Sequence, residues 1–189
     1  MPYLGSLVHC SDGSELEIER HTAFIRESMF ALDWNIWGSG ITLETKLLLY
    51  NTCLLPIFLY GTEIWCLTST LEKKIDAVDN WCLRCILHIY LTDFVSSDVV
   101  QSHTGQALLS DTIRQRHLSF FGHLCRADTG QDHSRALWAC IRDPPKDWGR
   151  RTGRPRQTGW EWLRMICTRS TSRRRTMDRP AWRTYVVDN

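Results

Sequence analysis

The sequence predicts a mainly α protein, a helical bundle with a short β segment at its N-terminus and a basic, partly irregular C-terminal tail. Two observations support this prediction. Apolar residues recur every three or four positions over several long stretches, which is typical of helices that pack on one face. Breakers and arginines gather after residue 143, where regular elements become short. The 189 residues, 43% of them hydrophobic, are enough for one domain with a real core.

The N-terminal residues carry the main strand signal. Residues 3–8 predict a short strand, and residues 11–14 predict a turn. Few strand candidates follow, so this strand lacks an obvious partner and we expect the chain to begin in mid-domain. A helix over about residues 15–34 comes next. The apolar residues near helical spacing in it are Ile18, Ile25, Met29 and Leu32.

The most apolar run, residues 47–60, predicts a buried helix. Thr42 or Thr45 can cap it after a loop through residues 38–40. The helix should bend near Pro56, because proline lacks the amide hydrogen that a helix interior uses. The run is too short to cross a membrane and contains polar residues, so we expect no membrane partner.

Two further helices are predicted from apolar stripes. The first stripe steps by 4, 3, 4, 3 and 4 positions along Leu71, Ile75, Val78, Cys82, Cys85 and Ile89. The second runs along Ile113, His117, Phe120 and Leu124, with Ser110 as a cap. Beyond a segment rich in proline and glycine, shorter helices are predicted near residues 158–169 and 178–187.

Charge is distributed unevenly along the chain, although the net charge is only +2. Residues 1–111 hold 6 Lys and Arg against 14 Asp and Glu, a balance of −8. Residues 112–189 hold 17 against 7, a balance of +10, and 16 of those cations are Arg. Arg can donate two hydrogen bonds to one phosphate and can stack on a base. This split favours a polyanion-binding tail on a more neutral folded body.

Seven arginines of the tail are candidate nucleic-acid contacts, namely Arg150, Arg151, Arg154, Arg156, Arg173, Arg174 and Arg175. The first four lie on a loop that Pro155 stiffens, where phosphate contact would order them. The alternative is a charge run that only water solvates. Lys46 is a further candidate for contact with a duplex backbone, whereas we interpret Lys73 and Lys74 as ordinary surface charge.

Eight cysteines, with no signal peptide and no glycosylation sequon, indicate an intracellular compartment, cytoplasm or nucleus, where thiols stay reduced. Cys82 and Cys85 with His123 and Cys125 are a weak zinc candidate, because the first two fall in an apolar stripe and the last two lack the usual gap between ligands. We expect no metal and no cofactor. The nine Trp residues could stack on bases, but we interpret them as helix-packing residues.

Several short motifs follow one another in an order that is more specific than any of them alone. The first group is Tyr3-Leu4-Gly5, Asp12-Gly13, Glu17-Ile18, Thr45-Lys46, Leu49-Tyr50, Pro56, Leu59-Tyr60-Gly61, Glu63 and Trp65. The second is Cys82-Leu83-Arg84, Ile86-Leu87, Asp93, Thr104-Gly105-Gln106, Ile113, Arg116, Phe121-Gly122-His123, Arg126, Gly153-Arg154-Pro155-Arg156, Thr158, Asp178-Arg179 and Trp182-Arg183. Together they resemble the region downstream of the catalytic centre in LINE-type (non-LTR) retrotransposon reverse transcriptases. Gly159 departs from the family pattern, which usually joins Thr directly to Trp.

The resemblance implies a remnant of the polymerase palm over residues 1–14, a thumb-like helical bundle over 15–126 and a basic C-terminal segment over 127–189. It implies RNA or DNA as partner, with an RNA–DNA hybrid for the parent enzyme. No Asp-Asp dipeptide occurs, so the paired carboxylates that hold the family's metal ions are missing and we expect no catalysis by this chain alone.

Two alternatives stand beside the truncated reverse transcriptase. One is a translated transposon remnant with no selected function, and the other is a basic adaptor that a host reuses to bind nucleic acid. In a truncated enzyme the helix face that met the palm would be exposed, which favours self-association.

Overall fold

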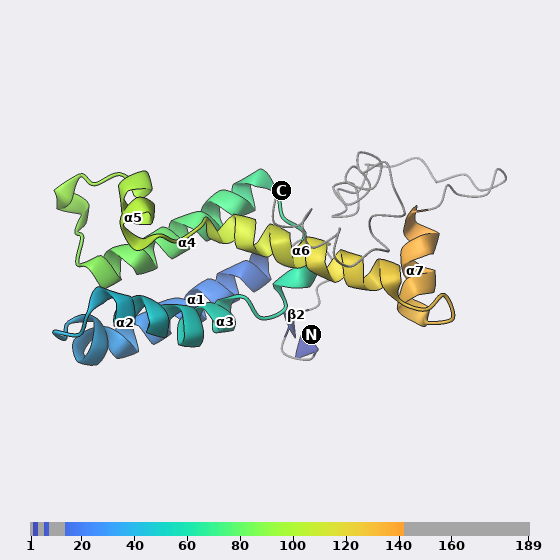
Figure 1. Ribbon diagram of the computed structural model, residues 1–189, viewed down its shortest axis with the longest axis horizontal. Coiled ribbons are helices and arrows are strands. Elements are labelled where there is room, and N and C mark those ends of the chain that lie inside the picture. Colours follow the sequence, from blue (N-terminus) through green and yellow to red (C-terminus); the bar gives the residue numbers. More distant parts are fainter. Residues whose placement is uncertain (1, 4–5, 8–13, 142–189) are drawn as a thin grey trace. The chain divides into compact units, whose positions relative to one another are not determined.

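The computed structural model describes residues 2–3, 6–7 and 14–141, without the side chains at positions 2–3, 6–7, 34, 91 and 139–141 (Figure 1). This part of the chain is mainly helical, as predicted. The strands are β1 (Pro2–Tyr3) and β2 (Ser6–Leu7), and the α-helices are α1 (Glu15–Leu32), α2 (Leu43–Leu49), α3 (Leu55–Phe58), α4 (Ser69–Leu87), α5 (Ser97–Thr104), α6 (Leu109–Arg126) and α7 (Asp132–Ile141). The chain divides into two compact units, residues 1–114 and 115–189, whereas the resemblance placed a boundary after residue 126.

The N-terminal strands form a two-stranded antiparallel pair in which Pro2 lies opposite Leu7 and Tyr3 lies opposite Ser6. The extended segment expected over residues 3–8 is therefore paired with its own neighbour. The pair consists of two-residue strands from the same few residues, and the long partner that the sequence did not supply is not among the described strands. Its origin as part of a palm stays a prediction.

Helix α1 confirms the helix predicted over residues 15–34 and is followed by a π-helical turn, Asp33–Trp37. Ile18, Ile25 and Met29 are buried, as their spacing predicted. The π-helical turn carries Trp37 back onto α1, where its indole Nε1 donates to Met29 O at 3.1 Å. Because Trp37 is fully buried, it closes one end of the core.

The next helical stretch is interrupted before its proline. Thr42 caps α2, because its side chain accepts from the Thr45 amide at 3.4 Å. A π-helical segment, Tyr50–Leu54, then joins α2 to α3, in which Pro56 is the second residue. Proline offers no amide hydrogen and crowds the carbonyl four residues earlier, so the helix widens just before Pro56. The perturbation predicted near Pro56 thus takes the form of a π-helical segment.

Helix α4 carries the apolar stripe that the sequence predicted. Its N-terminus is capped by Thr68, which accepts from the Leu71 amide. The stripe residues Leu71, Ile75, Val78 and Cys82 are buried, and Cys85 is half-buried. The helix ends at His88, whose backbone has a left-handed φ of 55°.

Helix α6 begins differently from the prediction. Its first residue is Leu109, so Ser110 lies inside the first turn. Ser110 donates from its amide and from its hydroxyl to the carboxylate of Asp76 on α4, each at 2.9 Å. The cap predicted at Ser110 is therefore supplied by Asp76, since a carboxylate at a helix N-terminus satisfies free amides and complements the dipole.

Within the second unit, the buried face of α6 is shifted from the predicted stripe. Leu118, Phe121 and Cys125 are buried, whereas Phe120 is 39% exposed. The prediction of His117, Phe120 and Leu124 was therefore off by one residue. Leu137 and Ser134 of α7 are also buried in this unit.

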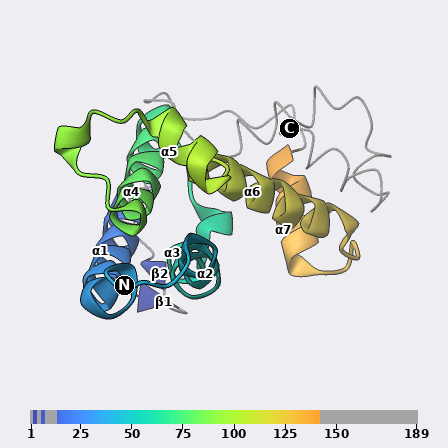
Figure 2. The ribbon, with the colours of Figure 1, turned by 60° about the vertical axis from the view of Figure 1, so that its left-hand side comes forward.

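The core of the first unit lies between α1, the α2–α3 stretch and α4. Figures 1 and 2 both show α1 beside α3 and α4. The largest fully buried side chains of this core are Trp37, Tyr50, Phe58, Ile25, Met29, Ile75, Leu83, Ile86 and Ile113. None of the helices in the described ranges combines the length and apolarity that crossing a membrane requires.

Candidate nucleic-acid interface

Lys46 was expected to face a nucleic-acid backbone, but the structure places it inside the first unit. The residue is 7% exposed, and its ammonium donates to the carbonyl oxygen of Trp37. The same oxygen lies 2.7 Å from Nε2 of His88, at the end of α4. Lys46 and His88 thus fasten α2 and α4 to the π-helical turn after α1. The Lys46 ammonium serves the fold and does not face outward.

Most other cations of residues 1–111 also have partners within the fold. Arg20 forms an ion pair with Glu17, and Lys74 forms one with Glu15 across α4 and α1. Arg26 lies over the Trp81 ring at 5.7 Å from its centroid. Arg84 donates to Asn80 Oδ1 at 2.9 Å and to the Val95 carbonyl at 2.6 Å.

The start of the basic half shows the same pattern where the structure describes it. Arg114 pairs with Glu72 at 2.8 Å and with Asp111 at 2.9 Å. Arg135 pairs with Asp132 on α7. The seven arginines predicted to contact nucleic acid, Arg150, Arg151, Arg154, Arg156, Arg173, Arg174 and Arg175, lie outside the described residues.

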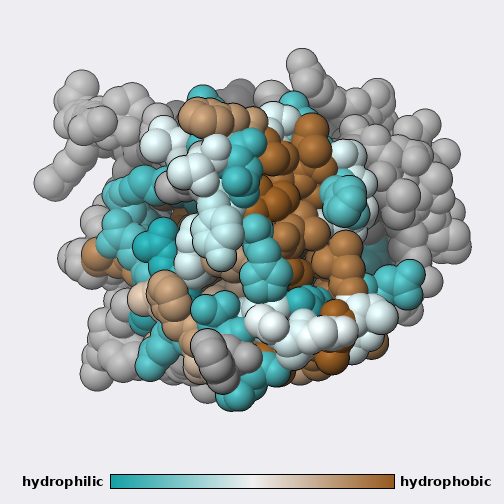
Figure 3. Space-filling model, turned by 90° about the vertical axis from the view of Figure 1, so that its left-hand side faces the viewer, coloured by the Kyte–Doolittle hydropathy of each residue, from teal (hydrophilic) through white to brown (hydrophobic). Residues whose placement is uncertain are grey.

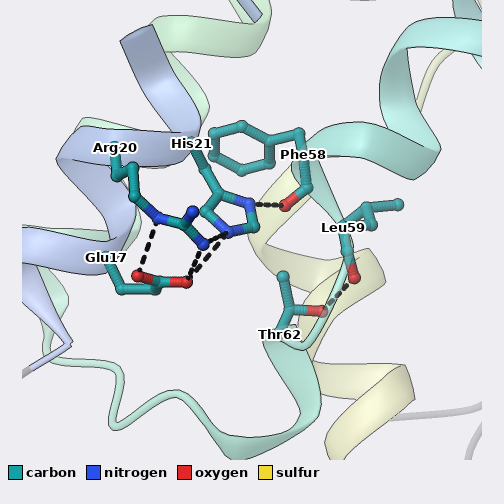
Figure 4. A network of polar contacts seen from close by, with 6 residues as sticks. All are labelled: Glu17, Arg20, His21, Phe58, Leu59 and Thr62. Carbon is teal, nitrogen blue, oxygen red and sulfur yellow. Dashed lines mark hydrogen bonds and ion pairs between the residues drawn. The ribbon is translucent and has the colours of Figure 1, made fainter. Parts of the chain in front are cut away.

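A buried polar network lies between α1 and the turn after α3 (Figure 4). His21, only 2% exposed, lies with Nδ1 2.8 Å from Phe58 O and with Nε2 3.1 Å from Glu17 Oε1. Arg20 donates to both oxygens of Glu17, from Nε at 3.1 Å and from Nη2 at 2.7 Å. Beside them Thr62 donates to the Leu59 carbonyl at 3.1 Å. This network ties α1 to a segment 37 residues away.

Three aromatic rings pack around the network. His21, Phe58 and Trp65 are mutually near perpendicular, with centroids 5.2 to 6.1 Å apart, a favourable aromatic geometry. The Trp65 indole N–H is buried and has no hydrogen-bond partner in the described part of the chain. Next to the rings is an open, mostly apolar groove of about 440 Å³. It is lined by Arg20, His21, Phe24, Pro56, Ile57 and Tyr60.

A second buried polar cluster joins the π-helical segment before α3 to α4. The Tyr50 hydroxyl donates to Asp79 Oδ1 at 2.6 Å, and Asp79 is only 4% exposed. Burial raises the pKa of Asp79 to about 6, against the lowering effect of the Tyr50 hydrogen bond. Burial also raises the pKa of the Cys82 thiol to about 12 and raises that of Tyr50. The cluster therefore contains a carboxyl whose ionised form is destabilised by burial and a thiol that stays protonated.

The zinc candidate has little support in the described residues. Among residues 14–141, no three His, Cys, Asp or Glu side chains are grouped so as to hold a metal ion. Metal binding needs a thiolate, and the buried Cys82 thiol has its pKa moved in the opposite direction. Three tryptophans of the first unit pack within the fold: Trp37 and Trp65 are buried, and Trp81 meets the Phe30 ring at 5.7 Å between ring centroids.

One face of the first unit exposes apolar side chains. Figure 3 shows a hydrophobic strip on the face that lies to the left in Figure 1, on the side of α2 and α5. In the loop between α4 and α5, Phe94 is 95% exposed and Tyr90 is 69% exposed. Phe94 also has a left-handed φ of 49°, which is uncommon for a bulky residue. This loop therefore projects an aromatic side chain into solvent.

Comparisons with family models, with curated proteins and with solved structures found no match to this chain. The residues that sequence reasoning missed are the buried polar ones, Glu17, His21 and Asp79. The spacing of Glu17 and His21, four residues apart on one helix, was the signal available for the first network. For Asp79 the signal was its position four residues after the buried Ile75, in phase with the apolar stripe.

Proposed function

We propose that this chain is the thumb-like and C-terminal, nucleic-acid-binding portion of a LINE-type reverse transcriptase, and that it does not polymerise DNA by itself. The observation that carries the proposal is the segregation of charge, −8 over residues 1–111 and +10 over residues 112–189. The order of the short motifs described above is the reason for proposing this family. The mainly helical fold agrees with a thumb-like bundle.

The use of cations in the first unit supports the assignment of binding to the tail. Of the six Lys and Arg in residues 1–111, five contact groups of the same unit: Arg20, Arg26, Lys46, Lys74 and Arg84. A cation that already pairs with a carboxylate or a carbonyl has part of its charge and some of its donors engaged, which makes it a weaker candidate for phosphate contact. Phosphate contact is therefore best assigned to the arginine-rich residues that follow position 141.

The chemistry of the proposed partner is that of a polyphosphate backbone. Arginines that contact phosphate oxygens do not read base edges through that contact, so they bind RNA, DNA and hybrid duplexes with little sequence preference. Each contact releases condensed counterions, so affinity falls steeply with salt. Residence inside the cell, in the cytoplasm or the nucleus, belongs to the same proposal.

The test compares the parent with three variants in nucleic-acid binding at several salt concentrations. One variant replaces Arg150, Arg151, Arg154 and Arg156 with Ala, and its matched control replaces the same four with Lys, which keeps the charge. The Ala variant should bind duplex, hybrid and single strands more weakly. Its salt slope should be smaller by about one unit for each phosphate-binding arginine that the substitutions remove.

The Lys control should keep most of the parent's salt slope, because a slope counts charges and does not depend on hydrogen-bond geometry. A double variant of the acidic half, Lys73→Ala with Lys74→Ala, should bind nearly as tightly as the parent. If the fourfold Ala variant matches the parent in affinity and slope, the arginines are a solvated charge run. The inactive transposon remnant then becomes the better account.

A further inference from the structure

In the loop between α4 and α5, Phe94 forms a rigid aromatic projection, 95% exposed and with a left-handed φ of 49°. Just before it, the Asp93 carboxylate accepts from the Tyr90 amide at 2.7 Å. Just after it, Arg84 of α4 donates to the Val95 carbonyl at 2.6 Å. A bulky residue keeps such a backbone only where the surrounding contacts hold it there. Phe94 therefore needs little further ordering to enter a concave site on a partner.

The groove between α1 and α3 has the opposite shape and is also apolar. Phe24 lines it from α1 and Ile57 lines it from α3, each 43% exposed, and Tyr60 lines it while 56% exposed. Its volume of about 440 Å³ falls within the range of about 300–1,000 Å³ that is usual for sites that hold organic ligands, so it has room for a phenyl ring. Covering these side chains removes apolar surface from water, which is favourable.

The charges around the projection and the groove are complementary. Arg20 lines the groove, and its side chain is 29% exposed although Glu17 accepts two of its hydrogen bonds. Phe94 lies between Asp93 and Asp98, which are both exposed, and residues 89–99 contain no Lys or Arg. Opposite charges across an interface fix its register and disfavour other partners. An occupant with carboxylates beside its aromatic anchor therefore fits this groove better than one with lysine or arginine there.

The projection cannot reach the groove of its own chain. Figures 1 and 2 both show the loop between α4 and α5 at one end of the first unit, away from α3. Both elements belong to one compact unit, so the distance between them is fixed by the fold. A second copy of the chain has to supply the projection that fills the groove.

We infer that the first unit carries a self-docking surface, in which Phe94 of one copy inserts into the groove between α1 and α3 of a second copy. The two surfaces in contact are different, so the interface is heterologous and builds either head-to-tail chains or a closed ring. This inference does not depend on the proposed function, because the projection and the groove both lie outside the arginine-rich tail.

The test measures the association of the full chain by sedimentation equilibrium, after nuclease treatment so that nucleic acid cannot bridge two copies. The balance of −8 over residues 1–111 makes two first units repel each other, and salt at about 0.15 M screens this repulsion beyond about 8 Å. Phe94→Ser removes the projection, and Ile57→Ser alters the groove. Leu48→Ser is the matched control, because Leu48 is 61% exposed on α2 and does not line the groove.

The parent should self-associate, and Phe94→Ser and Ile57→Ser should each lower the association constant at least about tenfold, because each removes an apolar anchor. Leu48→Ser should change it less than about threefold. An equimolar mixture of Phe94→Ser and Ile57→Ser should associate more strongly than either variant alone, since the first keeps the groove and the second keeps the projection. A monomeric parent, a Phe94→Ser variant that associates like the parent, or a mixture that associates no better than its components would overturn the inference.

A second measurement decides the case in which Ile57→Ser does not fold. Phe94 is replaced by a photoreactive phenylalanine analogue, and one of two mixed preparations is isotope-labelled so that crosslinks between copies are recognised by mass. We expect crosslinks from position 94 to residues 20–24 or 56–60 of the other copy. Crosslinks between copies that involve only other segments, or none at all, would show that the groove is not the site that receives Phe94.

Discussion

Replacing Asp79 with Asn should remove a pH-dependent penalty from the stability of the first unit. Asp79 is buried beside Tyr50 and Cys82, and its pKa is raised from 3.8 to about 6. A pKa raised in the folded state means that folding binds a proton between these two values. The contribution of Asp79 to stability is therefore most favourable at acidic pH, falls as pH rises from about 4 to about 6, and stays lower above that range.

The magnitude follows from the size of the shift. About two pKa units correspond to about 3 kcal/mol of free energy of unfolding, at 1.36 kcal/mol for each unit. Because Asp79 is only 4% exposed, solvent screening reduces this figure little. Asn keeps an oxygen that accepts from Tyr50, and the cost of its unpaired amide group does not depend on pH. The difference between variant and parent should thus grow by about 3 kcal/mol across the window.

The assay is urea unfolding followed by tryptophan fluorescence, since Trp37 and Trp65 are buried in this unit. Unfolding free energies are measured at several pH values from about 4 to about 7 for the parent, Asp79→Asn and Asp98→Asn. Asp98 is exposed on α5 and reports what loss of a surface carboxylate does by itself. Tyr50→Phe should widen the window upward, because the Tyr50 hydrogen bond lowers the pKa of Asp79. A difference curve for Asp79→Asn that stays flat across the window would refute the reasoning.

Three further outcomes are expected, beside the salt dependence of the arginine variants. The purified chain should show no templated DNA synthesis with Mg²⁺ or Mn²⁺, and incorporation above a no-enzyme control would contradict this. Lys46→Met should lower the free energy of unfolding by about 1–3 kcal/mol, because Trp37 O loses a charged donor, while nucleic-acid affinity stays unchanged. A large loss of affinity without a loss of stability would place Lys46 in the interface. Phe94→Ser should reduce the concentration-dependent self-association that sedimentation measures, because it removes the most exposed large apolar side chain among those described. If the association constant is unchanged in this variant, the loop between α4 and α5 is not part of the self-association surface.

The helices were predictable because their stability depends on a repeating apolar face. Helices α1 and α4 show this, since their buried residues follow the spacing read from the sequence. The π-helical segments were not predictable in the same way. Asp33–Trp37 depends on the docking of Trp37 against Met29, a contact between a side chain and a carbonyl that no local pattern encodes.

The shifted face of α6 has a physical cause in the division of the chain. Ile113 packs in the core of the first unit, whereas Leu118 and Phe121 are buried in the second unit, which starts at Gln115. The prediction of one continuous apolar stripe assumes that the whole helix packs against one core. When a helix passes from one unit to another, the direction of burial can change, and extrapolation from Ile113 then selects the neighbouring residues.

The buried polar residues were the part of the fold that sequence could not supply, because their partners are remote in sequence. Asp79 meets Tyr50 across 29 residues, and His21 meets Phe58 across 37 residues. A lone Asp or His on an apolar face gives no sign of which acceptor or donor will satisfy it. The structure identifies these partners, and it shows that burial, against the Tyr50 hydrogen bond, raises the pKa of Asp79.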